Sequence, residues 1–144
     1  MKKIGVRISQ LMNANPVTVD LDMTLPECAR KMLARNVGSV IVKDKGHLVG
    51  IVTEKDIVEE AVGKELNIKK TKVKDIMTTG MVQISPDSDL AEAVALMIRE
   101  DVRRLPVVKD GKLLGLVTVK DILNIQPKLY QTVYECLILK KTKR

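Results

Sequence analysis

The chain repeats itself at an offset of 65 residues, and this repeat restricts the possible folds more than any other feature. When residues 8–57 are laid on residues 73–122, 16 of 50 positions are identical without a gap. Unrelated segments of that length would share about three. A solenoid needs roughly three or more units, so two copies are too few for one. We therefore expect two half-cores that pack together about a pseudo-twofold axis.

Each copy carries the same order of local patterns. An amphipathic stripe with helical spacing covers residues 25–33 in the first copy, ending at Leu33, and residues 90–98 in the second. Two apolar runs around a Gly-containing turn follow, which is typical of a β-hairpin. A further helix is expected to begin after each hairpin, and a short extended segment precedes each stripe. The predicted fold is α+β, with two repeats of strand, helix, strand, strand, helix.

These patterns divide the chain into three parts. The first repeat is expected at residues 1–65, the second at 66–126, and a separate segment at 127–144. In that last segment Leu129, Val133 and Leu137 share one helical face, and Lys and Arg crowd the end. It predicts an amphipathic helix with a basic tail, docked on its own module or on a neighbouring molecule.

Composition narrows the class of protein. The 144 residues are 45% hydrophobic but contain neither Phe nor Trp, so the core must be aliphatic and stacking of nucleic-acid bases on aromatic side chains is disfavoured. No apolar run approaches the roughly 18 residues that span a bilayer. We expect a cytoplasmic protein that does not enter a membrane.

The sequence offers no recognisable catalytic or metal-binding group. Cys28 and Cys136 lack the number and spacing of a disulfide framework or metal site, and both are expected to be buried thiols. The single histidine, His47, falls in a polar hairpin turn and is expected to be exposed, without a nucleophile motif beside it. We therefore predict a protein that is not an enzyme and holds neither a metal nor a resident cofactor.

One short motif occurs in both copies. Gly-x-x-Thr-x-x-Asp stands at residues 50–56 and again at 115–121. Together with "DIM" at 75–77, the "PV" strand start and "RRLPVV" at 103–108, it resembles the CBS domain, named for cystathionine β-synthase. The doubled arrangement resembles the CBS pair, or Bateman module, over about residues 8–126.

The resemblance implies a regulatory sensor rather than an enzyme. In that family the pair binds adenosine-containing ligands such as AMP, ADP, ATP, S-adenosylmethionine or NAD, in clefts between the two copies. The family's ribose-binding acid corresponds here to Asp56 and Asp121, and its phosphate-side hydroxyl to Thr53 and Thr118. A carboxylate suits ribose hydroxyls, and a helix N-terminus suits a phosphate.

The same Thr-x-x-Asp spacing also fits a plain capping box at the start of a helix. Two other predicted helix starts, Thr24 with Glu27 and Asp89 with Glu92, use the longer Glu as the returning acid. Because Asp is shorter and is expected to close such a box less well, we interpret the repeated Asp as a ligand-binding residue that caps its helix only in the empty state.

The two copies differ in charge beside this motif. Arg103 and Arg104 stand where the first copy has Gly38 and Ser39. The resemblance implies that this segment faces the ligand whose ribose is held by the other copy, so the Arg pair is expected at the phosphate of the Asp56 ligand. The alternative is that these arginines are solvated surface charges or serve a dimer contact.

Short apolar segments are expected to contact the adenine. The candidates are Val17, Thr18 and Val37 in the first copy and Val82, Gln83 and Val102 in the second. From ligand size alone, at roughly 0.3 kcal/mol for each heavy atom, the expected dissociation constant is of order 10 μM.

Other partners stay open. The net charge of +7 is concentrated in residues 67–74 and in the C-terminal tail, which is also compatible with salt-sensitive nucleic-acid binding. A regulatory subunit that acts in trans on an enzyme or transporter is a third possibility. The resemblance further implies a homodimer.

Overall fold

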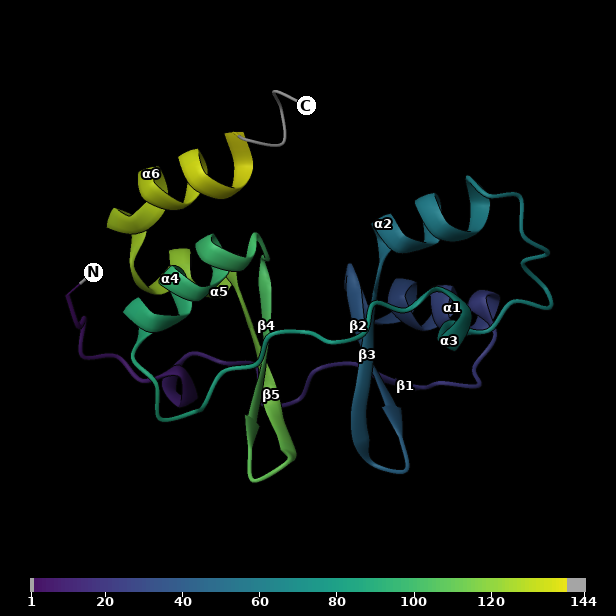
Figure 1. The fold of residues 1–144 in the computed structure, drawn as a ribbon, viewed down its shortest axis with the longest axis horizontal. Helices are drawn as coiled ribbons and strands as arrows, with labels where there is room; N and C mark the ends of the chain where they lie inside the picture. The colour runs from purple at the N-terminus through teal and green to yellow at the C-terminus, as the bar shows by residue number, and fades with distance from the viewer. Residues whose placement is uncertain (1, 140–144) are drawn as a thin grey trace. The chain divides into compact units, whose positions relative to one another are not determined.

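The computed structural model describes residues 2–139, which fold into two compact units (Figure 1). Unit 1 combines Met1–Asn15 with Val82–Arg144, and unit 2 is Pro16–Met81. The beginning of the chain therefore packs with the second repeat. The repeat boundaries predicted from the sequence, 1–65 and 66–126, stay a prediction. The two units group residues that pack together, which is a different criterion from sequence repetition.

Unit 2 contains a three-stranded sheet in the order β1-β2-β3, in which β1 is parallel to β2 and β2 is antiparallel to β3. Its helix α2 continues directly into the π-helical segment η2. The elements of unit 2 are β1 (Thr18–Asp20), α1 (Leu25–Arg35), β2 (Ser39–Asp44), β3 (His47–Thr53), α2 (Glu54–Asp56), η2 (Ile57–Val62) and α3 (Val73–Ile76).

Unit 1 contains a two-stranded antiparallel sheet, β4-β5, with helices from both ends of the chain. Its last three elements form the predicted C-terminal helix. The elements of unit 1 are η1 (Ile8–Gln10), α4 (Leu90–Glu100), β4 (Arg104–Lys109), β5 (Lys112–Thr118), α5 (Val119–Ile125), η3 (Pro127–Leu129), α6 (Tyr130–Val133) and η4 (Tyr134–Leu139). The predicted α+β class is confirmed.

Both hairpins turn through two residues with positive φ. These are Lys45 and Gly46 in unit 2, at 50° and 81°, and Asp110 and Gly111 in unit 1, at 52° and 74°. Such a pair is the signature of a type I′ turn, whose twist matches that of antiparallel strands. The polar Gly-containing turns read from the sequence are confirmed.

The first strand predicted for the second repeat does not form. In unit 2 the ends of β1 are bonded by Ile41 N–H to the Val17 carbonyl and by Leu21 N–H to the Lys43 carbonyl. Prolines occupy the positions equivalent to Ile41 and Leu21, namely 106 and 86, and proline has no N–H to donate. Only an isolated parallel bridge between Ile84 and Val107 remains in unit 1.

Each unit has its own aliphatic core. The core of unit 1 includes Val133 and Leu137, which are 2% and 1% exposed, so the C-terminal helix docks on its own module. The core of unit 2 includes Cys28 and Met32 of α1 and Ala61 of η2. The stripe predicted for α1 is correct except at its end, where Leu33 is 80% exposed.

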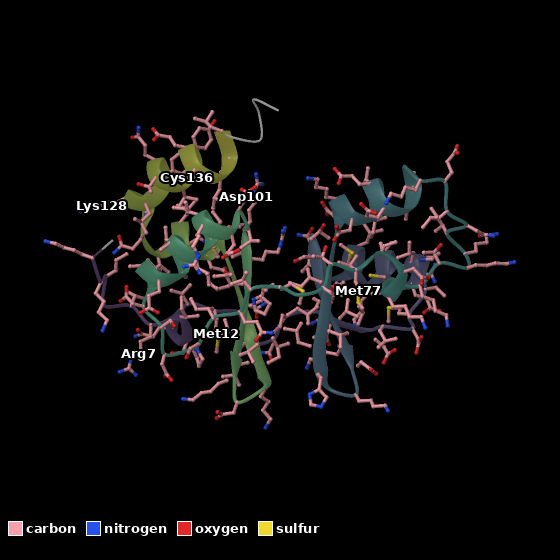
Figure 2. All side chains as sticks on the ribbon, in the orientation of Figure 1. Arg7, Met12, Met77, Asp101, Lys128 and Cys136 are labelled. Atoms are coloured by element: carbon pink, nitrogen blue, oxygen red, sulfur yellow. The ribbon has the colours of Figure 1, made fainter. Side chains whose placement is uncertain are left out.

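The segments before each repeat pack against a glycine of the hairpin. In unit 2, a Cβ at Gly50 would lie 2.6 Å from the Met77 sulfur, and in unit 1 a Cβ at Gly115 would lie 2.5 Å from the carbonyl oxygen of Asn13. Figure 2 labels Met77 beside β3 and Met12 beside β5. The Gly of the repeated motif is therefore needed for close backbone packing.

Within residues 2–139, every helix is too short or too polar to cross a bilayer.

Candidate functional site: two Thr-x-x-Asp helix starts

The motif of unit 2 forms a closed capping box at the start of α2. The Asp56 N–H donates to Thr53 Oγ1 at 3.1 Å, and the Thr53 N–H donates to Asp56 Oδ2 at 2.9 Å. β3 delivers Thr53 in an extended conformation, and the helix begins at the next residue. The hydroxyl and carboxylate thus satisfy two backbone donors that the helix start would otherwise leave unpaired.

Unit 1 repeats this geometry at the start of α5. The Asp121 N–H donates to Thr118 Oγ1 at 3.3 Å, and the Thr118 N–H donates to Asp121 Oδ2 at 2.9 Å. The Thr118 hydroxyl also donates to Asp121 Oδ2 at 2.9 Å, a bond that unit 2 does not show. The two motifs are therefore alike in their backbone contacts and differ in the orientation of the hydroxyl.

The expectation that Asp closes a capping box less well than Glu is wrong. Thr24 is the N-cap of α1 but makes no side-chain cap bond, and Asp89 caps α4 by accepting from the Ala91 N–H without a closed box. The short Asp suffices because its Oδ2 lies within 2.9 Å of the cap amide in both motifs. Capping is thus an observed role of Asp56 and Asp121, and their ligand role stays a prediction.

Capping leaves part of each motif unused. Asp56 and Asp121 are half-buried, and the Oδ1 atom of each makes no hydrogen bond to a residue in the range 2–139. The next amide along the helix, that of Lys55 or Lys120, has no backbone acceptor within the same range. Each helix start therefore presents one free carboxylate oxygen and one free N–H group.

The first amide of each helix is already occupied. Glu54 N–H donates to the Gly38 carbonyl, and Val119 N–H donates to the Arg103 carbonyl, both at 3.0 Å. These bonds fasten the helix start to the residue before the neighbouring strand. They also reduce the number of amides that could face an anion, compared with an open helix N-terminus.

Arg103 contacts the C-terminal helix. Its Nη2 donates to the Leu137 carbonyl at 3.3 Å, and its buried Nε finds no hydrogen-bond partner among residues 2–139. Arg104 is half-buried and pairs with Thr118 in the β4–β5 ladder. Both arginines thus stand beside the Thr118 motif of unit 1, and their predicted role at the phosphate of the Asp56 ligand remains a prediction.

The adenine candidates fall into two sets of three. Val17 and Val37 are half-buried against the core of unit 2, as Val82 and Val102 are against that of unit 1. The Thr18 carbonyl accepts a hydrogen bond from Lys31 Nζ at 2.6 Å. The sixth candidate, Gln83, is exposed. Contact with adenine stays a prediction for all six.

The histidine and the two cysteines show no sign of a reactive site. His47 is exposed, as predicted. Cys28 is buried, which raises the pKa of its thiol and disfavours the reactive thiolate, whereas Cys136 is half-buried rather than fully buried. No cluster of three or more His, Cys, Asp or Glu side chains suited to a metal occurs within residues 2–139.

Part of the basic segment between the repeats is neutralised. Lys74 Nζ lies 2.9 Å from Asp22 Oδ1, and Lys72 Nζ lies 3.7 Å from the same atom. The hydrogen bond from Lys74 lowers the pKa of Asp22, with Lys72 contributing through its charge. The basic tail at 140–144 lies outside the described residues.

Comparison with known proteins gives matches along most of the chain. The CBS domain family model matches residues 8–63 and 73–128. The protein MK0525 of Methanopyrus kandleri is 37% identical over 133 residues, which cover 91% of this chain and 68% of that protein.

Solved structures agree with these matches. A conserved protein of Pyrococcus horikoshii is 25% identical, with a TM-score of 0.79 over 86% of this chain and 94% of its own. A hexameric CBS-CP12 protein from bloom-forming cyanobacteria is 28% identical, with a TM-score of 0.75 over 83% of this chain and 67% of its own.

Proposed function

Because the chain belongs to the CBS-domain family, we propose that it is a non-catalytic regulatory module that binds an adenosine-containing ligand through Asp56 and Asp121. Tandem CBS domains are typically regulatory modules, and the relatives described above carry no enzyme's name. The ligands considered are AMP, ADP, ATP, S-adenosylmethionine and NAD.

The observation that carries this proposal is the spare oxygen of each capping carboxylate. Oδ2 of Asp56 and of Asp121 holds the helix start, while Oδ1 is free to accept hydrogen bonds from ribose hydroxyls. An ionised carboxylate oxygen is a strong acceptor, so such a bond contributes about 1.5–3 kcal/mol where water is excluded. Capping and ribose binding therefore use different atoms of the same side chain and can coexist.

The phosphate is assigned to the donors next to that carboxylate. The free amide of Lys55 or Lys120 and the hydroxyl of Thr53 are the nearest candidates, whereas the Thr118 hydroxyl already donates to Asp121 Oδ2 and would have to turn to reach a phosphate. In unit 1, Arg103 is held by the C-terminal helix, and its buried Nε offers one further donor. We assign the stronger phosphate interaction to a ligand whose phosphate reaches Arg103 and Arg104.

The proposal extends to assembly and location. We assign the chain to the cytoplasm and propose a homodimer that signals to an effector protein in trans. The assembly of a related CBS-CP12 protein into a hexamer supports self-association of such modules. Nucleic-acid binding is less favoured, because Lys72 and Lys74 already pair with Asp22.

A thermal-shift panel with the five ligands tests the proposal on the full chain. For a dissociation constant of order 10 μM, a ligand at a hundredfold excess over that constant stabilises the folded state by about 2.7 kcal/mol. We expect a concentration-dependent rise in melting temperature with at least one adenosine compound. Guanosine and cytidine nucleotides serve as controls for the base.

Substitution of the two aspartates separates capping from binding. Asp56→Glu and Asp121→Glu keep a carboxylate that can close the box, while moving the free oxygen away from the ribose. We expect both variants to melt near the wild-type temperature without ligand and to lose most of the ligand-induced shift at their own site. Asp→Ala at either position removes the cap as well, so the melting temperature without ligand falls.

Two results would refute the proposal. The first is the absence of any shift with all five ligands at millimolar concentration. The second is a shift that the double Glu variant retains in full, because the aspartates would then act only as helix caps.

A further inference from the structure

Arg103 connects two helices of unit 1. Its carbonyl accepts the Val119 N–H at the start of α5. Its side chain reaches the C-terminal helix, where Nη2 donates to the Leu137 carbonyl at 3.3 Å. Gly38 occupies the equivalent position in the first repeat, so unit 2 has no counterpart of this side chain. Arg103 therefore joins the helix start of the second motif to the end of the C-terminal helix.

The guanidinium of Arg103 is poorly satisfied while the C-terminal helix is docked. Within residues 2–139 it makes one hydrogen bond, to the neutral Leu137 carbonyl, and 3.3 Å is longer than the usual range of about 2.7–3.2 Å. No carboxylate of this range forms an ion pair with it. Its Nε is buried and has no partner there. A buried donor without an acceptor and a cation without a counter-charge both oppose the docked arrangement.

Aliphatic contacts hold the C-terminal helix in place. Val133 and Leu137 are 2% and 1% exposed in the core of unit 1, and Cys136 packs against the same cluster. The turn that carries Leu137, Tyr134–Leu139, is π-helical, a rare form that often marks a functional site. Val133 lies one turn before Leu137, so the last turn can leave Arg103 while Val133 stays in the core.

A phosphate competes directly with the Leu137 carbonyl for Arg103. Nε and Nη2 lie on the same edge of a guanidinium and form the fork that binds two oxygens of one anion. In the docked helix this fork is divided, because Nη2 faces the carbonyl and Nε is covered. A hydrogen bond to an ionised oxygen is roughly twice as strong as one to a neutral carbonyl. An anion that takes the whole fork is therefore favoured over the docked helix end.

We propose that the contact between Arg103 and Leu137 is a latch that an anion opens. A phosphate group bound by Arg103 displaces the Leu137 carbonyl and releases the last turn of the C-terminal helix, Tyr134–Leu139. The inference rests on the proposed function, because the phosphate is that of the adenosine ligand. It adds a way for ligand occupancy to change the surface of unit 1, since the ligand favours the released state.

Cys136 is a reporter for the latch. It is half-buried on the C-terminal helix, next to Leu137 (Figure 2). The variant Cys28→Ala leaves Cys136 as the single thiol and introduces the residue that the second repeat has at Ala93. The rate at which a maleimide modifies Cys136 in the full chain then measures how often the last turn opens.

Modification rates are compared with and without ligand, at concentrations that saturate the thermal shift. We expect ATP to accelerate modification of Cys136 at least about fivefold, and the phosphate-free ligands adenosine and S-adenosylmethionine to leave it unchanged. Arg103→Met has a similar length but no donor, so it should abolish the acceleration by ATP. Arg99→Met is the matched control, because Arg99 is exposed and pairs with Glu100, and it should keep the acceleration.

Thermodynamic linkage requires the reverse effect as well. Leu137→Ala loosens the last turn, so it should tighten ATP binding in titration calorimetry without tightening adenosine binding. A purely structural role of Leu137 predicts equal or weaker ATP binding. If Leu137→Ala does not fold by circular dichroism, Leu137→Val is used, with a smaller change of the same sign. This comparison also decides the matter if Arg103→Met no longer binds ATP.

The outcomes distinguish the latch from the proposed function. The absence of a thermal shift with every ligand refutes both. A thermal shift with ATP and an unchanged rate at Cys136 refutes the latch alone. Equal acceleration by ATP and adenosine, or an acceleration that Arg103→Met retains, does the same. Acceleration that light scattering shows to accompany dissociation of a dimer also refutes the latch, because an opened interface would then expose Cys136.

Discussion

Unit 1 and unit 2 are built from the same repeat, yet they bury different amounts of their helices. In unit 1 the C-terminal helix adds Val133 and Leu137 to the core, whereas in unit 2 Leu33 of α1 and Val58 of η2 are exposed. The sheets differ in the opposite sense, with three strands in unit 2 and two in unit 1. A duplicated sequence therefore specifies the shared hairpin and helix starts, while a few substituted positions and one added helix decide what each unit exposes.

The largest expected difference in stability is between a buried residue of the C-terminal helix and an exposed residue of α1. Leu137→Ala removes a side chain that is 1% exposed, and we expect a loss of about 3 kcal/mol in the free energy of unfolding because a cavity remains. Leu33→Ala, at 80% exposure, should change it by less than about 0.5 kcal/mol. Urea denaturation of both variants measures the two values. Equal losses would show that Leu33 is buried in solution.

A smaller difference in stability cost is expected when the two hairpin glycines are replaced by alanine. Gly115→Ala should cost about 2 kcal/mol, because the new Cβ would meet the Asn13 backbone. Gly50→Ala should cost about 1 kcal/mol, because the nearest atom belongs to the flexible Met77 side chain. Hydrogen exchange of amides in each unit measures the local loss. Met77→Ala should partly rescue the Gly50 variant, and failure of that rescue would assign the cost to the Thr78 carbonyl.

The helix caps should show a still smaller effect of similar size in both units. Thr53→Ala and Thr118→Ala each remove a hydroxyl that accepts a bond from the first turn, and each should cost about 1 kcal/mol of unfolding free energy. Thr→Ser at either position is the matched control, since it keeps the hydroxyl. A clearly larger cost at Thr118 would indicate that its additional bond to Asp121 contributes separately.

The last expected difference between the units concerns their stability at low pH. The N–H groups of Ile4, Ala91 and Gly5 bond to Asp89 and lower the pKa of its carboxyl, and Thr24 occupies the equivalent position in unit 2. Because the folded pKa is below the unfolded one, this group stabilises unit 1 above the ordinary aspartate pKa of about 3.9 and loses that effect as the pH falls through its folded pKa.

Asp89→Asn tests this linkage. The variant should lose less stability than wild type when urea denaturation is repeated from about pH 5 down to about pH 3. Hydrogen exchange should place the difference in unit 1, near the N-terminal segment that Asp89 holds. An unchanged pH dependence would mean that other carboxyls, such as Asp22, dominate acid unfolding.

Much of each repeat could be predicted because its signals are local. Gly46 and Gly111 mark the turns, and Thr53 and Thr118 mark helix starts, since each acts on its immediate neighbours. The bonds that secure the predicted first strand are not local. They depend on N–H groups at positions 41 and 21, which the second repeat replaces with proline at 106 and 86.

The residues of the two capping boxes could be predicted from the sequence, but the geometry of the boxes could not. The spacing of Thr53 and Asp56 fits both a capping box and the proposed ligand motif, and sequence alone could not show that Asp56 Oδ2 serves the cap while Oδ1 is left over. The engagement of Arg103 by the Leu137 carbonyl was also missed. These residues are separated by 34 positions, and no pattern in the sequence connects them.

The packing of the segment before Asn15 with the second repeat has an evolutionary consequence. The residues before Met81 pack in the same way with the first repeat, so a chain with one repeat would hold a hairpin whose Gly50 or Gly115 has no segment against it. Such an ancestor could complete its fold by exchanging segments with a second molecule, as the two repeats do within this chain. Gene duplication and fusion would then have turned an assembly of two chains into a single covalent one without redesigning either hairpin.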